Sequence, residues 1–171
     1  VRRAVVEAAE TPFVAPAVDQ PFRLLVFGGS QGAQFFSDVM PKVIGRLPYE
    51  LGERLQVTQQ ARPEDEAELR GWYSDNEIEA EIAPFFSDMA ARLAAAHLVI
   101  SRAGASTVTE LAVVGRPAVL VPYPHALDHD QATNAKAMAE AGGVEVIAQS
   151  DASPEALREF LMNLMADTER L

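Results

Sequence analysis

The chain has 171 residues, 49% of them hydrophobic and 23% charged, which is the composition of a globular domain with a buried core. Its 25 acidic and 14 basic side chains give a formal net charge of −11, which argues against a nucleic-acid partner because such partners require a basic face. Cysteine is absent, which excludes disulfides and thiolate metal sites, and no apolar run approaches the ~20 residues of a membrane-spanning helix.

Both ends of the sequence indicate a truncated chain. The first residue is Val1 rather than methionine, and the chain stops after "LMNLMADTERL" without a helix-ending signal, so we expect a fragment of a longer protein. Residues 1–21 contain Pro12, Pro16 and Pro21, which predict an extended connector. Regular alternation of structure is expected only from residue 22 onward.

Short apolar strands alternate with helices along the rest of the chain. The predicted strands are "RLLVFGG", "RLQVTQQ", "EAEIAPF", "HLVISR", "RPAVLVPYP" and "VEVIAQ". The predicted helices are "AQFFSDVMPKVIGRL", "RPEDEAELRGWY", "SDMAARLAAA", "STVTELAVVG", "DQATNAKAMAEAGG" and "SPEALREFLMNLM". Ser87 or Asp88 is expected to cap the third helix and Ser153 the last, while Gly115 and Gly142–Gly143 end helices.

Strands that are apolar throughout, with helices between them, predict a parallel sheet covered on both faces. We therefore expect an α/β fold, a Rossmann-like doubly wound parallel sheet of about six strands. Ligands bind such sheets beyond the carboxyl ends of the strands. The loops at 28–32, 84–88, 102–106 and 122–131 all follow strands, so we expect them at one edge.

Two glycine turns at this edge are candidate anion sites. The first, "GGSQG" (Gly28–Gly32), opens a helix directly after a strand, where backbone N–H groups and the hydroxyl of Ser30 could meet a phosphate. It could equally be only a tight turn. The second, "RAGASTVTE", places Gly104 before a helix that carries Glu110. Glu110 is either a solvated helix carboxylate or an acceptor for both hydroxyls of a ribose.

The loop "HALDHDQATN" is the most polar part of the edge. It predicts hydrogen bonds to a sugar, with Asp128, Asp130, Gln131 and Asn134 as candidates, although Asp130 could merely cap the following helix. A metal site is conceivable, but the spacing matches no metal motif. No nucleophile elbow or catalytic base is recognisable, so the residues supply hydrogen-bond donors rather than a reactive centre.

Four stretches occur in the same order in a known family: "LLVFGGSQGA", "FFSDMA", "SRAGASTVTELAVVGRPAVLVPYPHALDHDQATNA" and "EAGG". By these motifs the chain resembles the peptidoglycan N-acetylglucosaminyltransferases (MurG) of glycosyltransferase family 28. The resemblance covers nearly the whole chain and implies the C-terminal half of a two-domain GT-B enzyme. It makes residues 1–21 an interdomain connector from an N-terminal domain, and residues 22–171 a nucleotide-sugar (donor) domain truncated at its C-terminal end.

The resemblance also implies residue roles in binding UDP-N-acetylglucosamine. Arg2 and Ser30 contact the nucleotide sugar, Ser30 at its diphosphate, and the backbone of Phe86 reads the uracil edge. The phosphates and ribose are held by the loop and helix start formed by Gly104, Ala105, Ser106, Thr107, Val108 and Thr109. Glu110 accepts the ribose hydroxyls and Gln131 faces the sugar. Supporting positions are Gly28, Gly29, Gln31, Gly32, Asp130 and Asn134.

The implied reaction is an inverting transfer of N-acetylglucosamine from UDP to the C4 hydroxyl of undecaprenyl-pyrophosphoryl-MurNAc-pentapeptide, which converts lipid I to lipid II. Helix N-termini would stabilise departing UDP without a cofactor or a tightly bound metal. The general base and the membrane contact would belong to the N-terminal half of an enzyme peripheral to the cytoplasmic side of the bacterial inner membrane. We therefore expect this chain to bind donor weakly and to catalyse nothing alone.

Two alternatives remain open from the sequence. One is another UDP-sugar enzyme of the GT-B fold, a glycolipid glucosyltransferase or a UDP-sugar epimerase. The other is a non-enzymatic nucleotide-binding module. A phosphate-receiving signalling domain is disfavoured because the first strand ends Val26–Phe27–Gly28–Gly29, without the acidic residues that such a domain requires.

Overall fold

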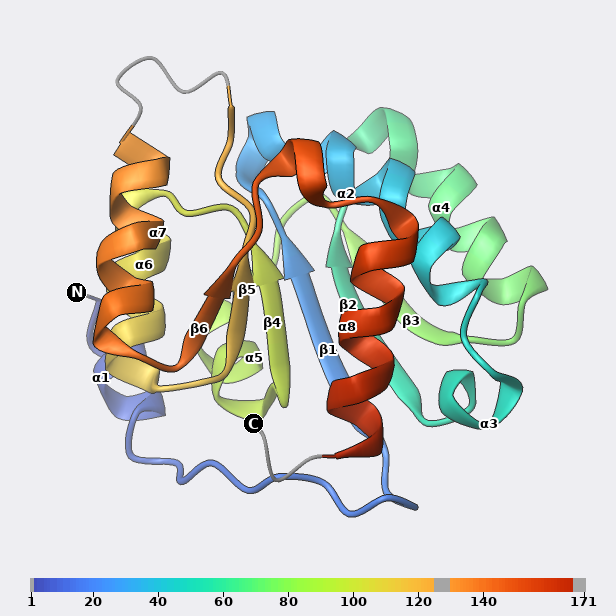
Figure 1. The fold of residues 1–171 in the computed structure, drawn as a ribbon, viewed down its shortest axis with the longest axis horizontal. Helices are drawn as coiled ribbons and strands as arrows, with labels where there is room; N and C mark the ends of the chain where they lie inside the picture. Colours follow the sequence, from blue (N-terminus) through green and yellow to red (C-terminus); the bar gives the residue numbers. More distant parts are fainter. Residues whose placement is uncertain (1, 125–129, 168–171) are drawn as a thin grey trace.

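A six-stranded parallel sheet forms the centre of the structure (Figure 1). The structure is a computed structural model that describes residues 2–124 and 130–167, except the side chains of residues 30–32 and 130. The sheet has the order β3-β2-β1-β4-β5-β6, and every neighbouring pair is parallel. This is the Rossmann order, so the predicted doubly wound fold is confirmed. The strands are β1 (Phe22–Phe27), β2 (Leu55–Gln60), β3 (Glu79–Ala83), β4 (Leu98–Ser101), β5 (Ala118–Leu120) and β6 (Val144–Val146).

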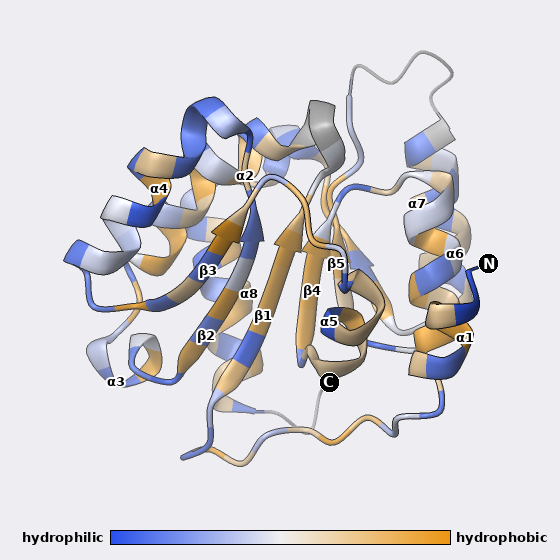
Figure 2. Cartoon of the chain, turned by 180° about the vertical axis from the view of Figure 1, so that it is seen from behind, coloured by the Kyte–Doolittle hydropathy of each residue, from blue (hydrophilic) through white to orange (hydrophobic). Residues whose placement is uncertain are grey.

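Helices cover both faces of the sheet. One face carries α2 (Gly29–Ile44), α4 (Pro63–Asp75) and α8 (Pro154–Ala166). The other carries α1 (Arg3–Ala8), α5 (Met89–Ala95), α6 (Ala105–Val114) and α7 (Asp130–Ala141). Two short elements, α3 (Tyr49–Gly52) and a 3-10 turn at Gln149–Asp151, lie in connections and were not predicted. Figure 2 shows the second face, with hydrophobic residues along β1 and β4 and hydrophilic residues on the outer sides of the helices.

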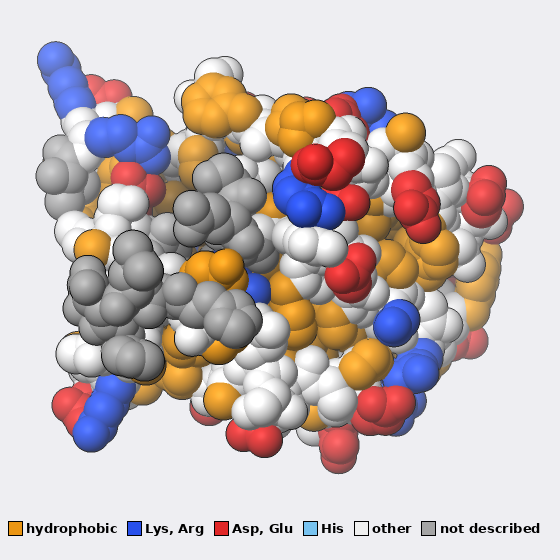
Figure 3. Space-filling model, turned by 90° about the horizontal axis from the view of Figure 1, so that it is seen from above, with side chains coloured by type: hydrophobic (Ala, Val, Ile, Leu, Met, Phe, Trp, Pro, Cys, Tyr) orange, Lys and Arg blue, Asp and Glu red, His pale blue; other side chains and the backbone are white. Residues whose placement is uncertain are grey.

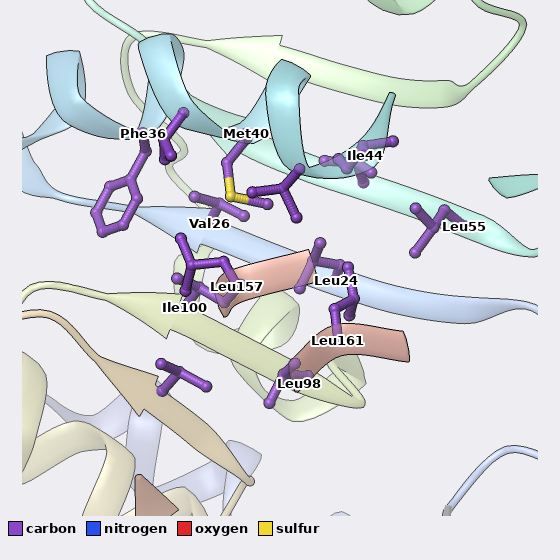
Figure 4. Packing of buried hydrophobic residues seen from close by; sticks show 14 of the residues in the cluster. Leu24, Val26, Phe36, Met40, Ile44, Leu55, Leu98, Ile100, Leu157 and Leu161 are labelled. Carbon is purple, nitrogen blue, oxygen red and sulfur yellow. The ribbon is translucent and has the colours of Figure 1, made fainter. Parts of the chain in front are cut away.

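The core is divided by the sheet because successive strand side chains point to opposite faces. Leu24 and Val26 of β1 pack with α2 and α8 on the first face, whereas Leu25 packs with α5 and α6 on the second. Figure 4 shows the first cluster, in which Met40 of α2 lies near the strand residues. All four residues of β4 are buried, as expected for a central parallel strand.

Helix ends follow the predicted signals with one exception. The hydroxyl of Ser153 accepts a hydrogen bond from the N–H of Ala156 (3.1 Å), and Gly115 ends α6 with φ of +73°. Asp88 precedes α5 but does not cap it, so that prediction was wrong. Its carboxylate instead accepts a hydrogen bond from Nε of Arg92 (2.8 Å), because a charged partner one helical turn away competes with the backbone.

The prediction of extended structure throughout residues 1–21 was also wrong. Residues 3–8 form α1, because Val5 is fully buried between α5 and α6 and thereby stabilises a helix too short to form alone. The segment after α1 runs along the ends where the strands begin (Figure 1). It is tied to the domain there by Arg116, which donates to the carbonyl of Thr11 (2.8 Å), and by Arg54, which donates to those of Ala17 and Gln20 (both 3.0 Å).

Candidate functional site

The loops after the strands gather at the carboxyl edge of the sheet, as predicted, because all strands are parallel. Figure 3 looks down onto this edge. At its centre, β1 pairs with β4, and the chain reverses its direction of winding between them. The helix after β1 and the helix after β4 both begin here, so the N-termini of α2 and α6 flank the switch point, the usual ligand position in such sheets.

The N-terminus of α6 is open to a ligand. Gly104 precedes the helix in extended conformation (φ −62°, ψ 152°), and as a glycine it has no side chain to cap the first turn. The first intrahelical bond runs from Val108 N–H to the carbonyl of Gly104 (3.0 Å), which leaves the preceding N–H groups without helical acceptors. Together with the helix dipole, these groups favour an anion. The hydroxyl of Thr109 is used inside the helix, where it donates to the carbonyl of Ala105 (2.9 Å).

The N-terminus of α2 is held by a residue that sequence reasoning missed. Oε1 of Gln60, at the end of β2, accepts hydrogen bonds from the N–H groups of Gly28 (3.1 Å) and Gly29 (2.9 Å). Its Nε2 donates to the carbonyl of Pro84 (3.1 Å), which ties the loop after β3 to the glycine turn. Gly29 has φ of +73°, a conformation that favours glycine.

The side chains of residues 30–32 lie outside the description, and only their backbone is placed, in the first turn of α2. The predicted contact of the Ser30 hydroxyl with phosphate therefore stays a prediction, as do the supporting roles of Gln31 and Gly32. The predicted loop residues 125–129 and the side chain of Asp130 also lie outside the described residues.

Arg2 and Glu110, 108 positions apart, meet in a bidentate ion pair. Nε and Nη2 of Arg2 donate to Oε1 and Oε2 of Glu110 at 2.9 and 3.0 Å. The Glu110 side chain is only 15% exposed and that of Arg2 59% exposed. They line an open hollow of about 770 Å³ with Ala105, Ser106 and Thr109. Five of the predicted contact residues thus share one hollow beside the start of α6.

Gln131 and Asn134, at the start of α7, clamp the loop that precedes α6. Oε1 of Gln131 accepts hydrogen bonds from the N–H groups of Ala103 (3.2 Å) and Tyr123 (2.8 Å). Nδ2 of Asn134 donates to the carbonyl of Ala103 (3.2 Å). The side-chain carbonyl of Gln131 therefore joins the loops after β4 and β5, and its predicted contact with the sugar stays a prediction. Asn134 thus holds the loop before α6, and the supporting role in donor binding predicted for it stays a prediction.

Phe86 lies in the loop after β3 and is 7% exposed. The guanidinium of Arg92 lies over its ring at 4.4 Å and also donates to the carboxylates of Glu81 and Asp88. These charge-assisted bonds hold the pKa values of Glu81 and Asp88 below their ordinary range. The arrangement fixes the loop, which a backbone contact to a base would require; the uracil contact itself stays a prediction.

Arg102, between β4 and α6, is a second residue that sequence reasoning did not select. It is 5% exposed, and its Nη1 donates to the carbonyl of Val121 (3.2 Å), with a longer contact to that of Pro122 (3.4 Å). Burial lowers its pKa to about 10, so it remains charged at neutral pH. No sequence pattern marks an arginine as buried, although its place directly before the glycine turn could have drawn attention to it.

No group of three or more potential metal ligands occurs within residues 2–124 and 130–167. None of the helices described in those residues combines the length and apolarity needed to cross a bilayer.

Comparison with known proteins identifies the family. Residues 23–171 match the model of the glycosyltransferase family 28 C-terminal domain. The chain belongs to this family. Over all 171 residues it is 60% identical to a UDP-N-acetylglucosamine–N-acetylmuramyl-(pentapeptide) pyrophosphoryl-undecaprenol N-acetylglucosamine transferase of Mesorhizobium japonicum. It is 58% identical over the same span to the enzyme of that name from Rhizobium etli.

The same family is represented among solved structures. The crystal structure of Acinetobacter baumannii MurG superposes with a TM-score of 0.77 at 33% identity, over 90% of this chain and 46% of that one. The chain also spans only 46% of each of the two curated relatives, about half their length. These family 28 relatives confirm the predicted resemblance and favour the peptidoglycan glycosyltransferases over the alternatives left open by the sequence.

Proposed function

We propose that this chain binds UDP-N-acetylglucosamine at the carboxyl edge of its sheet, as the donor-binding domain of a peptidoglycan N-acetylglucosaminyltransferase. The observation that carries the proposal is the pair of adjacent helix N-termini at the switch point, with Glu110 on the second turn of α6. The N–H groups in the first turn of α6, which have no helical acceptors, suit a diphosphate, and a carboxylate beside them suits ribose hydroxyls. In this proposal residues 22–171 form the donor domain, and residues 1–21 connect it to the acceptor side.

The donor would lie across the switch point. The diphosphate and ribose would contact the start of α6 from Gly104 to Thr109, and Glu110 would accept the ribose hydroxyls. The uracil would meet the backbone at Phe86, and the amide of Gln131 would donate to the sugar. Each oxygen of Glu110 has two lone pairs, so it can accept from ribose while paired with Arg2. Arg2 would then neutralise a carboxylate that otherwise repels the diphosphate.

In the proposed reaction the C4 hydroxyl of lipid I attacks the anomeric carbon with inversion, and the bond from that carbon to the β-phosphate oxygen breaks. The negative charge that develops on UDP would be stabilised by the N–H groups of α2 and α6, without a cofactor or a tightly bound metal. The acceptor proton would pass to a base outside this chain. Acceptor binding, that base and peripheral attachment to the cytoplasmic side of the inner membrane would belong to the half of the relatives that this chain does not match, so the chain alone would be inactive.

Calorimetric titration with UDP-N-acetylglucosamine tests the proposal. Glu110→Ala should weaken donor binding about ten- to a hundred-fold, or about 1.4–2.7 kcal/mol, through loss of a charge-assisted pair of hydrogen bonds. Glu7→Ala is the matched control, because Glu7 also pairs with an arginine (Arg3, 2.9 Å) but is 62% exposed on α1. UDP-glucose should bind more weakly than the acetamido sugar. Equal affinities for the unchanged chain and Glu110→Ala, or no saturable binding up to millimolar donor, would contradict the proposal.

A further inference from the structure

Two arginines, Arg102 and Arg116, are buried in this domain at opposite ends of its strands. Arg102 is 5% and Arg116 4% exposed, and neither is paired with a carboxylate among the described residues. A buried charge without a counter-ion is costly unless its donors are satisfied. The hydrogen-bond partners of each guanidinium therefore indicate the role of that arginine.

Arg116, near the start of β5, is satisfied by carbonyls. Its Nε donates to Ala94 (2.9 Å), Nη1 to Val114 (3.0 Å) and Nη2 to Thr11 (2.8 Å). The ring of Phe13 lies 5.6 Å from the guanidinium carbon. All three nitrogens thus have acceptors, and together they join α5, α6 and the N-terminal segment. This is a structural brace.

Arg102, at the end of β4, is satisfied less completely. Only its Nη1 has described acceptors, the carbonyls of Val121 and Pro122, and its buried Nε has no hydrogen-bond partner among the residues that the structure describes. Three aromatic rings surround the guanidinium carbon, with centroids at 5.0–5.3 Å: Phe35 and Phe36 of α2, and Tyr123 after β5. Aromatic faces attract a cation and exclude water, but they do not neutralise its charge.

The position of this charge matches the proposed phosphate site. Arg102 directly precedes Ala103 and Gly104, which lead into α6, while its guanidinium lies against two rings of α2 and the loop after β5, so the charge lies next to the helix that follows β1 and its backbone enters the helix that follows β4. The chain as a whole carries −11 and repels anions. A cation shielded from water acts over a longer range than an exposed one, because the surrounding dielectric constant is lower.

We propose that Arg102 is a positioning residue of the donor site, one that braces α2 against the loop after β5 and supplies a fixed positive charge beneath the nucleotide diphosphate. This inference rests on the proposed donor function. It assigns to Arg102 a selectivity for the charged diphosphate over the uncharged nucleoside, without direct contact with the donor.

The test is NMR titration of the chain and its variants with two probes, UDP and uridine. Arg102→Met should weaken UDP binding by about ten-fold or more and leave the affinity for uridine within about two-fold, because uridine carries no charge. Arg102→Lys, which restores the charge, should recover most of the UDP affinity. Arg116→Met removes one buried arginine from the other edge and should leave both affinities unchanged, which controls for net charge.

Each other outcome overturns the assignment. Equal losses for UDP and uridine in Arg102→Met would make Arg102 a structural brace only, and an equal UDP loss in Arg116→Met would reduce the effect to net charge. Should Arg102→Met not fold, Arg102→Gln removes the charge and keeps a polar amide donor in place of the guanidinium. Where uridine binding is too weak to measure, failure of Arg102→Lys to restore UDP affinity decides against the proposal.

Absence of UDP binding by the unchanged chain would overturn both this inference and the donor function, whereas UDP binding that is insensitive to Arg102→Met would overturn this inference alone.

Discussion

The two edges of the sheet differ in how the hydrogen-bond donors of their arginines and loops are paired. At the amino edge, Arg54 and Arg116 donate to the carbonyls of residues 11–20, and Nδ1 of His97 accepts from the N–H of Arg23 (2.8 Å). At the carboxyl edge, Gly104 before α6 has no side chain to cap the first turn, and the buried Nε of Arg102 has no partner among the described residues. The arginines of the amino edge thus donate to carbonyls of the N-terminal segment, whereas the carboxyl edge keeps helix N–H groups without helical acceptors and a buried arginine with an unpartnered Nε among the described residues.

A hollow alone does not distinguish the two edges. The amino edge also has one, of about 460 Å³, lined by Phe13, Leu111, Arg116, Phe160 and Leu164 among others. The donors of the arginine in that hollow are already used by carbonyls. The chemistry of the unsatisfied groups, rather than the volume, assigns the ligand to the carboxyl edge.

The largest effect should come from the amino edge. Arg116→Met removes three charge-assisted hydrogen bonds and leaves the carbonyls of Ala94, Val114 and Thr11 without this donor. We expect the free energy of unfolding to fall by about 2–4 kcal/mol, with no change in donor affinity. Urea denaturation of the variant, followed by UDP titration in the absence of urea, measures both. A loss of donor affinity with unchanged stability would reverse the roles of the two edges.

Substitution of Gln60 should have an intermediate effect on stability. Gln60 lies at the carboxyl edge, and its side-chain amide is hydrogen-bonded to backbone groups of the domain. Gln60→Ala leaves the N–H groups of Gly28 and Gly29 without their acceptor and should lower the free energy of unfolding by about 1–2 kcal/mol. Gln60→Glu keeps an acceptor and adds a negative charge at the start of α2. It should weaken UDP binding by about ten-fold, which isothermal titration of the two variants would show. Unchanged UDP affinity in Gln60→Glu would mean that the start of α2 is not near the diphosphate.

The smallest effect should be a pH dependence of stability at the amino edge. Burial lowers the pKa of His97, with Arg23, Arg54 and Arg116 adding to the shift. Because the folded pKa lies below the unfolded value of about 6.5, stability is fully present above that value and is lost as pH falls through it, by at most about 1.4 kcal/mol per pH unit. Urea midpoints between pH 8 and 5 should show this slope, and His97→Gln should remove it. A slope that persists in the variant would assign the titration elsewhere.

Much of this architecture could be predicted from the sequence because local signals and burial agree. Strands such as "HLVISR" are apolar on both faces, and Gly115 and Ser153 mark helix ends with specific backbone chemistry. Short α1 could not be predicted, because its stability comes from the burial of Val5 against α5 and α6, which are distant in the sequence.

The candidate site was also predictable in part, because local sequence patterns mark the loops that form it. Glycine turns after strands indicate the edge, and the family resemblance pointed to Arg2 and Glu110, which the structure brings together. The bond from Gly29 to Gln60 and the enclosure of Arg102 by rings depend on which strands are neighbours, so no local pattern carries them. The capping role expected of Asp88 was wrong because Arg92, one turn later, is a stronger partner than the backbone.

Donor binding at the carboxyl edge is tested most directly by NMR chemical shifts of the backbone amides of this chain during titration with UDP-N-acetylglucosamine. We expect saturable shifts at Gly104–Thr107, at the start of α2 and around Phe86, and none along residues 11–20 at the amino edge. Saturable shifts confined to the amino edge, or no shifts at the start of α6 at millimolar donor, would contradict it.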